Sequence, residues 1–263
     1  MLLYYGDVLL CTIGGLILCG LLSAQFEKLF VRLVGGAGGY KAIMATAIIG
    51  TPVHEAGHAL MCLIFGHKIN EIKLYQPDKK TGTLGYVSHS YNKKNLWQNI
   101  GNFFIGLGPI FSGLVVITLI LFVCFTDAAN DFFQSAFALV KSGDGIFSVI
   151  GEIFRLLWHM LTEKGNIIVK IIAFMLMSAI VLHVNLSPAD IKNSKSGLAT
   201  FAIVAGVFTF VTSFLSLSAI AAIRSALHAF ATYCFVVFAL IYAIEIFVIA
   251  VAAIFYAVKR IKK

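Results

Sequence analysis

Residues 45–65 read ATAIIGTPVHEAGHALMCLIF, an apolar stretch that carries two histidines and one glutamate. The polar centre of this stretch, residues 54–58, is an HExxH pattern. On a helix, two histidines four residues apart project from one face, about one turn apart, and can bind the same tetrahedral Zn²⁺. Glu55 lies beside that face, where it can accept a proton from a water molecule on the metal.

The flanks of the motif place it at membrane depth. Residues 45–49 and 59–65 contain no charged side chain. An ionisable group in such a setting costs roughly 2.5 kcal/mol or more, and it is a functional-site hypothesis by default. A chance match on the wet face of a soluble helix would not have these flanks. We therefore interpret His54 and His58 as zinc ligands and Glu55 as the catalytic base.

The composition is that of a membrane protein. Of the 263 residues, 60% are apolar and 12% are charged, and the mean hydropathy is +0.94. A soluble domain of this length would not show these values. The net charge of +8 comes mostly from short loops and the C-terminus, where basic residues set membrane orientation, so we expect no nucleic-acid partner. The five cysteines lie in apolar stretches without CxxC spacing, which argues against a disulfide framework or a thiolate metal site.

Six apolar stretches are long enough to cross a hydrocarbon core of about 30 Å. The sequence therefore predicts an all-α polytopic membrane protein with about six transmembrane helices. We expect one integral membrane domain over residues 1–263, with a catalytic core at about 41–196 and C-terminal helices at 197–258. The six stretches are approximately 7–26, 41–66, 97–126, 166–186, 197–221 and 228–258.

A small β-hairpin is predicted between the second and third helices. Residues 69–75 alternate between apolar and polar, residues 77–82 supply turn chemistry, and residues 83–91 alternate again. The hairpin is either a plain connector or an edge strand that pairs with an extended substrate.

The basic residues assign the two sides of the membrane. With six spans, the loop 67–96, the loop near residue 190 and the C-terminal tail fall on one face, and together they hold most of the lysines. The positive-inside rule makes that face cytoplasmic, so we expect a cell-membrane protein with both termini in the cytoplasm. The opposite segments hold the acidic residues Glu27, Asp127, Asp131, Asp144, Glu152 and Glu163.

A third zinc ligand is needed, because a catalytic zinc site usually has three protein ligands and one open position. The polar patch at the end of the fourth predicted helix, residues 183–192, supplies the candidates. Asp190 is the first choice and His183 the second, and the residues alone leave both open. For Asp190 the alternative role is that of an ordinary helix-end residue after Pro188.

The chain resembles the site-2 protease family of intramembrane zinc metalloproteases, over roughly half its length. The resemblance rests on His54, Glu55 and His58, on Gly108-Pro109 with Ser112-Gly113, and on Asn185-Leu186-Ser187-Pro188 with Asp190. It implies two histidines and an aspartate on zinc, a glutamate base, and cleavage of membrane-embedded substrates near the cytoplasmic side. The chain departs from the family in the shorter gap between Pro188 and Asp190 and in Ile191, which stands where the family has glycine.

The implied reaction is metal-assisted hydrolysis of a peptide bond, with a membrane protein as the substrate. A helical substrate must unwind before cleavage, and pairing with the hairpin or hydrogen bonding to Asn185 would stabilise its extended form. The loop 67–96 is too short for a PDZ-like insert, so substrate selection falls to the hairpin, the helices or an adaptor protein.

Other functions stay open from the sequence. A CAAX-type or heat-shock-type membrane metalloprotease also uses HExxH but takes a glutamate as third ligand, and the downstream candidates are Glu152, Glu163 and Glu245. A non-proteolytic zinc-binding membrane protein with a binding, transport or scaffold role is the other alternative. Glu55 argues against it, because a structural site has no use for a base.

Overall fold

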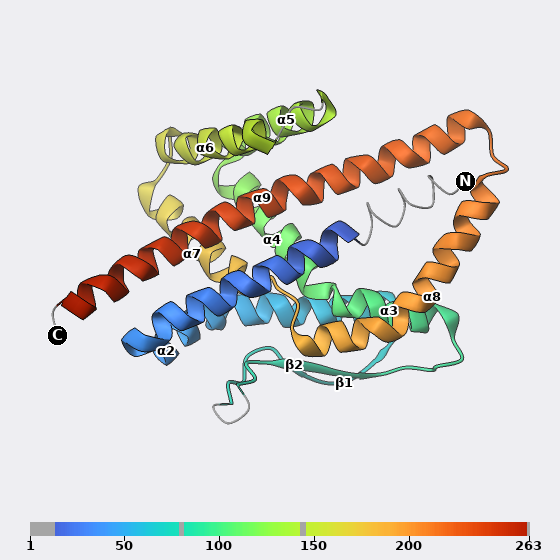
Figure 1. Cartoon of the computed structure of the whole chain (residues 1–263), viewed down its shortest axis with the longest axis horizontal. Coiled ribbons are helices and arrows are strands. Elements are labelled where there is room, and N and C mark those ends of the chain that lie inside the picture. The colour runs from blue at the N-terminus through green and yellow to red at the C-terminus, as the bar shows by residue number, and fades with distance from the viewer. Residues whose placement is uncertain (1–13, 79–81, 143–145, 262–263) are drawn as a thin grey trace.

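The structure is a computed structural model that describes residues 14–78, 82–142 and 146–261; within these ranges the side chains of residues 35–42, 146 and 259–261 are outside the description. The chain is mostly helical with one small hairpin, which confirms the predicted class (Figure 1). Its elements are α2 (Gly15–Ile64), β1 (Lys68–Lys73), β2 (Tyr86–Ser90), α3 (Leu96–Gly106), α4 (Gly108–Cys124), α5 (Thr126–Ser142), α6 (Ile146–Thr162), α7 (Ile167–Val181), α8 (Pro188–Thr212) and α9 (Leu217–Ile261).

The long helix α2 doubles back on itself. A Cβ atom added to Gly20 would lie 2.6 Å from Ile110, and one added to Gly57 would lie 2.3 Å from the backbone of Gly108. In a straight helix, Gly20 and Gly57 would be about 55 Å apart, yet both contact the first turn of α4. The two limbs of α2, residues 15–34 and 43–64, therefore run past the same part of α4, as the two blue segments of Figure 1 show.

Three helical segments among the described residues are long and apolar enough to cross a membrane, namely Ile43–Ile64, Pro188–Thr212 and Leu217–Val258. The pair α3 and α4, bent by 59°, would make a fourth as one broken span. The apolar helices thus indicate a membrane protein, but the predicted count of six spans is not confirmed. The expected span 7–26 lies partly outside the described residues, and α7 has only 15 residues.

Two predicted helix boundaries need correction. The expected helix 97–126 is broken at Leu107, because Pro109 has no N–H to donate to the carbonyl of Ile105. The expected helix 197–221 begins earlier, at Pro188, because Ser187 and Asp190 form a capping box that starts α8 there. These two helix ends lie against each other, since a Cβ added to Gly106 would lie 2.6 Å from the carbonyl oxygen of Asp190, and both shape the polar site described below.

The predicted hairpin is an antiparallel pair of strands, with Lys68 opposite Ser90 and Ile72 opposite Val87. Figure 1 places it beneath α3, at the end of the molecule away from the α5–α6 pair. The apolar core lies between α4, α7 and α9, where Ile117, Met177 and Val237 are each 0% exposed. The hairpin is therefore a surface layer beside the helices.

The close approach of α2 and α4 gives a test of the fold. A methyl group at Gly57 would meet Gly108 O at 2.3 Å and Ser112 Oγ at 2.6 Å, and backbone atoms cannot move aside as a side chain can. We expect Gly57→Ala to destabilise the protein by about 2 kcal/mol or more, measured by thermal unfolding in detergent.

Gly151 on α6 is the matched control, because an added methyl group has no neighbour within 4 Å among the described residues. Gly151→Ala should be neutral or stabilise by about 0.5–1 kcal/mol, since alanine is the better helix former. Equal stability of the two variants would show that α2 and α4 do not pack as described.

Candidate metal centre

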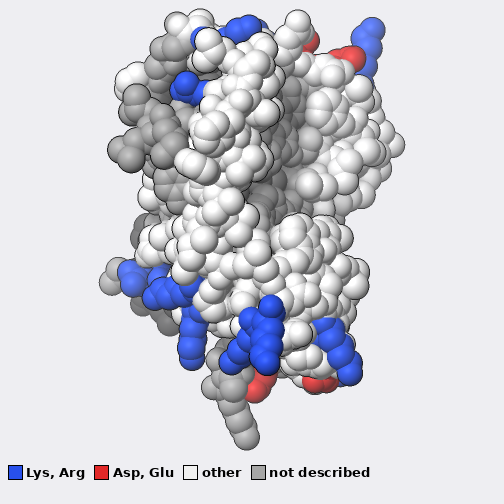
Figure 2. Space-filling model, turned by 90° about the vertical axis from the view of Figure 1, so that its right-hand side faces the viewer, with Lys and Arg blue, Asp and Glu red and all other residues white. Residues whose placement is uncertain are grey.

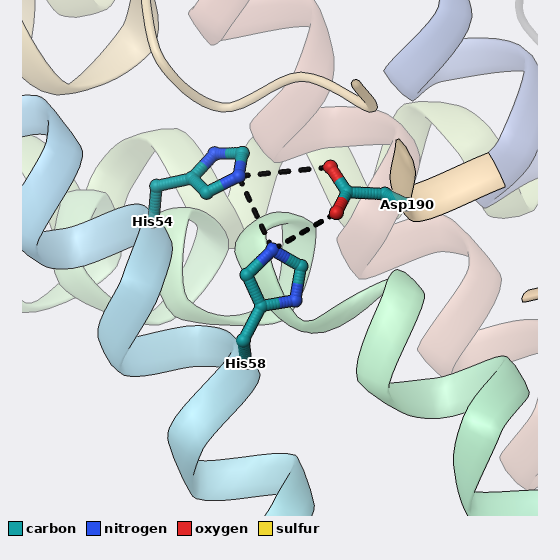
Figure 3. A group of neighbouring side chains, drawn as sticks. All are labelled: His54, His58 and Asp190. Atoms are coloured by element: carbon teal, nitrogen blue, oxygen red, sulfur yellow. Dashed lines mark hydrogen bonds and ion pairs between the residues drawn. The ribbon is translucent and has the colours of Figure 1, made fainter. Parts of the chain in front are cut away.

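Three side chains that are distant in the sequence converge between α2 and α8. His58 Nε2 lies 3.1 Å from Asp190 Oδ1, and His54 Nε2 lies 3.7 Å from Asp190 Oδ2. The two Nε2 atoms are 3.3 Å apart. One nitrogen or oxygen atom from each of the three residues lies within 4.8 Å of the others, so a single ion could contact all three (Figure 3).

The other ring nitrogen of each histidine is held by a backbone carbonyl. His54 Nδ1 lies 2.8 Å from the carbonyl oxygen of His183, and His58 Nδ1 lies 2.7 Å from that of Ile105. A carbonyl oxygen only accepts hydrogen bonds, so each Nδ1 must carry the hydrogen and donate it. In the neutral ring, Nε2 is then a bare lone pair, which is the form that ligates a metal.

The consequence is electrostatic. Two bare Nε2 atoms and one carboxylate point at a common position inside the protein, and such a group of lone pairs is stable only with a cation or a shared proton among them. Two neutral imidazoles and one carboxylate, with the cavity on the remaining side, are a ligand set suited to catalytic zinc. The residues present therefore fit a zinc ion.

The carbonyl of Ile105 is available because of Pro109. In a continuous helix the N–H of residue 109 would donate to the carbonyl of residue 105, and proline has no N–H. The break between α3 and α4 thus releases the acceptor that binds His58 Nδ1. The carbonyl of His183 is available for a different reason, because α7 ends at Val181 and the N–H of Ser187 donates to Asp190 instead.

Asp190 has two roles at once. Its Oδ2 accepts the backbone N–H of Ser187 at 2.8 Å, and its own N–H donates to Ser187 Oγ at 3.1 Å. This capping box fixes the carboxylate at the first turn of α8, with Oδ1 directed at His58. The helix-end role that the sequence suggested for Asp190 is therefore present together with its place in the cluster.

The other candidates for the third ligand lie elsewhere. The ring of His183 is 3.3 Å from Thr46 Oγ1, and His183 meets His54 through its backbone carbonyl. Glu152 lies on α6, Glu163 follows α6 and Glu245 is buried on α9. Within the described residues, only His54, His58 and Asp190 form a group of three or more metal-binding side chains.

The cluster opens into a cavity of about 860 Å³. Glu55 lines this cavity beside His54 and His58. The residue as a whole is 6% exposed. Asn185 also lines it, with Nδ2 donating to Glu27 Oε2 at 3.0 Å. Residues 82–87, which run from the turn at Gly82 into β2, line one side, and Gly85 packs against the side chain of Glu55.

The sequence missed three parts of this site. Glu27 was grouped with the acidic residues of the opposite membrane face, whereas the structure places it in the cavity wall against Asn185. His89, on β2, is a further lining residue that the motifs did not identify. The carbonyl of Ile105 could have been found, because Pro109 is visible in the sequence and lies four residues later.

Comparison with protein-family models, with curated proteins and with solved structures found no match for the chain.

The ligand set predicts how zinc content responds to mutation. We expect about one zinc per purified chain, lost in His54→Ala and in His58→Ala, as measured by elemental analysis. Asp190→Asn keeps an oxygen that can cap α8 but removes the charge. It should weaken zinc binding by more than the roughly 10- to 100-fold that is typical for losing a partner of a ligand.

Two controls separate metal binding from local structure. Ser187→Ala removes the hydroxyl of the capping box, and His183→Leu replaces the ring but keeps the carbonyl that binds His54. Both variants should retain zinc. Full zinc content in Asp190→Asn together with its loss in His183→Leu would make histidine the third ligand.

Proposed function

We propose that the chain is an intramembrane zinc metalloprotease similar to the site-2 proteases, which hydrolyses peptide bonds of membrane-embedded proteins. One observation carries this proposal: two imidazoles with bare Nε2 atoms and one carboxylate converge beside Glu55 at the edge of an open cavity. His54, His58 and Asp190 would hold the ion. When bound, zinc polarises the scissile carbonyl and makes water a stronger acid.

The chain's own residues supply the remaining chemistry. Glu55 accepts the proton of the attacking water and delivers it to the leaving amine. The backbone carbonyls of Ile105 and His183 keep the two imidazoles turned toward the ion. The surrounding apolar helices exclude bulk water, so access is limited to the cavity.

Substrate binding falls to the wall opposite the cluster. Residues 82–87 line the cavity and lead into β2, and an unwound peptide could pair with this strand through its backbone. Asn185 has its Nδ2 engaged by Glu27, so a contact with substrate would use its Oδ1. Both contacts would favour the extended form of a segment that is helical before cleavage.

The other candidate functions are less well supported. A glutamate-ligand metalloprotease would need Glu152, Glu163 or Glu245 in the cluster, and Asp190 stands there among the described residues. A structural, scaffold or transport role for the ion would leave Glu55 and the open cavity without a task. We therefore propose hydrolysis, with substrate identity and any adaptor protein to be found by experiment.

Glu55→Gln tests the reaction. The amide keeps the size of the side chain but cannot accept a proton, so zinc content should be unchanged and cleavage of single-span substrates should fall by about 10²- to 10⁴-fold. Glu71→Gln is the control, because Glu71 is an exposed partner of Lys73 on β1 and lies outside the cavity. Cleavage by the Glu55 variant at the rate of the Glu71 variant would assign the activity to another site.

We also propose that the basic end of the protein faces the cytoplasm. Lys and Arg side chains gather at the lower end of the view in Figure 2, where Figure 1 places the hairpin, while the middle of that face is almost free of charge. This end carries Lys68, Lys73, Lys93 and Lys94 around the hairpin and Lys192 and Lys195 at the start of α8. The positive-inside rule assigns the side that is richer in Lys and Arg to the cytoplasm.

Single cysteines test this orientation in a variant whose five native cysteines are replaced by alanine. Lys94 and Lys164 are both exposed, on the segments before α3 and after α6. An impermeant maleimide should label Lys164→Cys in intact cells and Lys94→Cys only after permeabilisation. The reverse pattern would invert the orientation of the protein.

A further inference from the structure

Two histidines outside the metal cluster form a pair at the hairpin. His67 follows α2 and is 5% exposed, and His89 lies on β2. Their Nδ1 atoms are 3.0 Å apart, and His67 stacks on Tyr91 with ring centroids 5.0 Å apart. Nothing in the hydrolytic mechanism above uses either ring.

The hydrogen bonds of this pair determine where each proton lies. His67 Nε2 is 2.7 Å from the backbone carbonyl of Gln98, which only accepts, so Nε2 carries the hydrogen. In neutral His67, Nδ1 is then bare and must accept from His89 Nδ1. Neutral His89 therefore has its hydrogen on Nδ1 and a bare lone pair on Nε2. Burial lowers the pKa of both His67 and His89, which keeps both rings neutral at pH 7.

His89 lines the cavity, and its Nδ1 is engaged by His67. His89 lines the cavity and His67 does not, so the Nδ1 edge turned toward His67 leaves the Nε2 edge on the cavity side. On β2, Tyr86, Val87 and His89 all line the cavity. His89 therefore places a basic hydrogen-bond acceptor in the cavity wall, and its hydrogen bond to His67 determines its tautomer.

The distance between His89 and Glu55 can be expressed as a number of residues along the chain. Gly85, four residues before His89, packs against the Glu55 side chain, since an added Cβ would lie 2.9 Å from Glu55 Cγ. A strand advances about 3.3 Å per residue, so His89 lies about 13 Å farther along the wall. An extended peptide running beside this wall would meet His89 about four residues from the bond next to Glu55.

We propose that His89 Nε2 is a substrate-binding acceptor, which receives a backbone N–H of the extended substrate about four residues from the scissile bond. The inference rests on the proposed proteolytic function. A peptide that unwinds among apolar helices loses its own N–H acceptors, and each unpaired N–H in such surroundings is costly. His89 replaces one of those acceptors.

Nitrogen NMR of the histidine-labelled protein tests the proton positions without any substrate. His67 should show the Nε2–H tautomer and His89 the Nδ1–H tautomer, with each ring assigned by its loss in a variant. The opposite tautomer at His89 would overturn the inference, whatever the protein cleaves.

Three substitutions at His89 test the contact with substrate. Asn keeps a donor toward His67 but has no atom at the Nε2 position. Gln places an amide oxygen near the Nε2 position. Phe has neither the donor toward His67 nor an acceptor at the Nε2 position. We expect Asn and Phe to raise KM about two- to tenfold with little change in kcat, and Gln to stay closer to the wild type. If the ring only supports the fold, Asn would resemble the wild type and Gln would be impaired, which overturns the inference.

The assay uses a synthetic single-span peptide that the wild-type protein cleaves, and zinc content is measured for every variant. N-methylation of the peptide at successive positions should raise KM most about four residues from the cleaved bond in the wild type, and this sensitivity should vanish in His89→Phe. Sensitivity that persists in His89→Phe would assign the N–H to another acceptor. If the wild type with bound zinc cleaves no peptide, the proposed function fails and the substrate contact fails with it, whereas the tautomers stand or fall by NMR alone.

Discussion

The structure depends on one constraint: each ring nitrogen of the two motif histidines must have a partner inside an apolar protein. An unpaired polar group costs several kcal/mol where neither water nor protein can satisfy it. The Nδ1 atoms donate to the carbonyls of His183 and Ile105, whereas the Nε2 lone pairs face the carboxylate of Asp190, which is also an acceptor, so a cation or a proton must lie between them. These contacts hold together the second limb of α2, the end of α3, the segment after α7 and the start of α8.

Breaks in helices supply these partners. A complete helix uses all its interior carbonyls, so an intact 97–126 helix would have none to offer to His58. Pro109 removes one donor and thereby frees Ile105 O, and the end of α7 frees His183 O. Pro188 begins α8 and lets Ser187 and Asp190 cap each other. The same residues that shorten the apolar helices therefore build the polar site.

Glycines decide how closely these pieces approach. Gly57 and Gly108 bring the backbones of α2 and α4 together, and a Cβ on either would lie within 2.6 Å of the other residue. Gly106 faces Ser194, and Gly197 faces the backbone of Phe103, so α3 and α8 approach in the same way. Because His58 follows Gly57 and Asp190 precedes Ser194 by one turn, both seams contribute to the spacing of the cluster.

The parts of the site that could be predicted from the sequence are those encoded by short local patterns. The spacing of His54, Glu55 and His58 and the polar patch around Asp190 are visible in short windows, and so are the two strands of the hairpin. The doubling back of α2, the contact of Glu27 with Asn185 and the pairing of His67 with His89 join residues 22 to 158 positions apart, and no local period encodes them. The span count is not confirmed for a related reason, because hydropathy marks apolar stretches but does not mark where a proline ends a helix inside one.

The hairpin gives the cavity a kind of wall that helices cannot. A helix satisfies its backbone groups internally, whereas an edge strand leaves a row of N–H and C=O groups free. The carbonyls of Thr83 and Leu84 accept the N–H groups of Asp78 and Gln76, and residues 82–87 line the cavity beside Glu55. Three side chains suffice to hold an ion among apolar helices. An unwound chain needs backbone partners along its length, and we propose that β2, an edge strand whose Tyr86 and Val87 line the cavity, offers them.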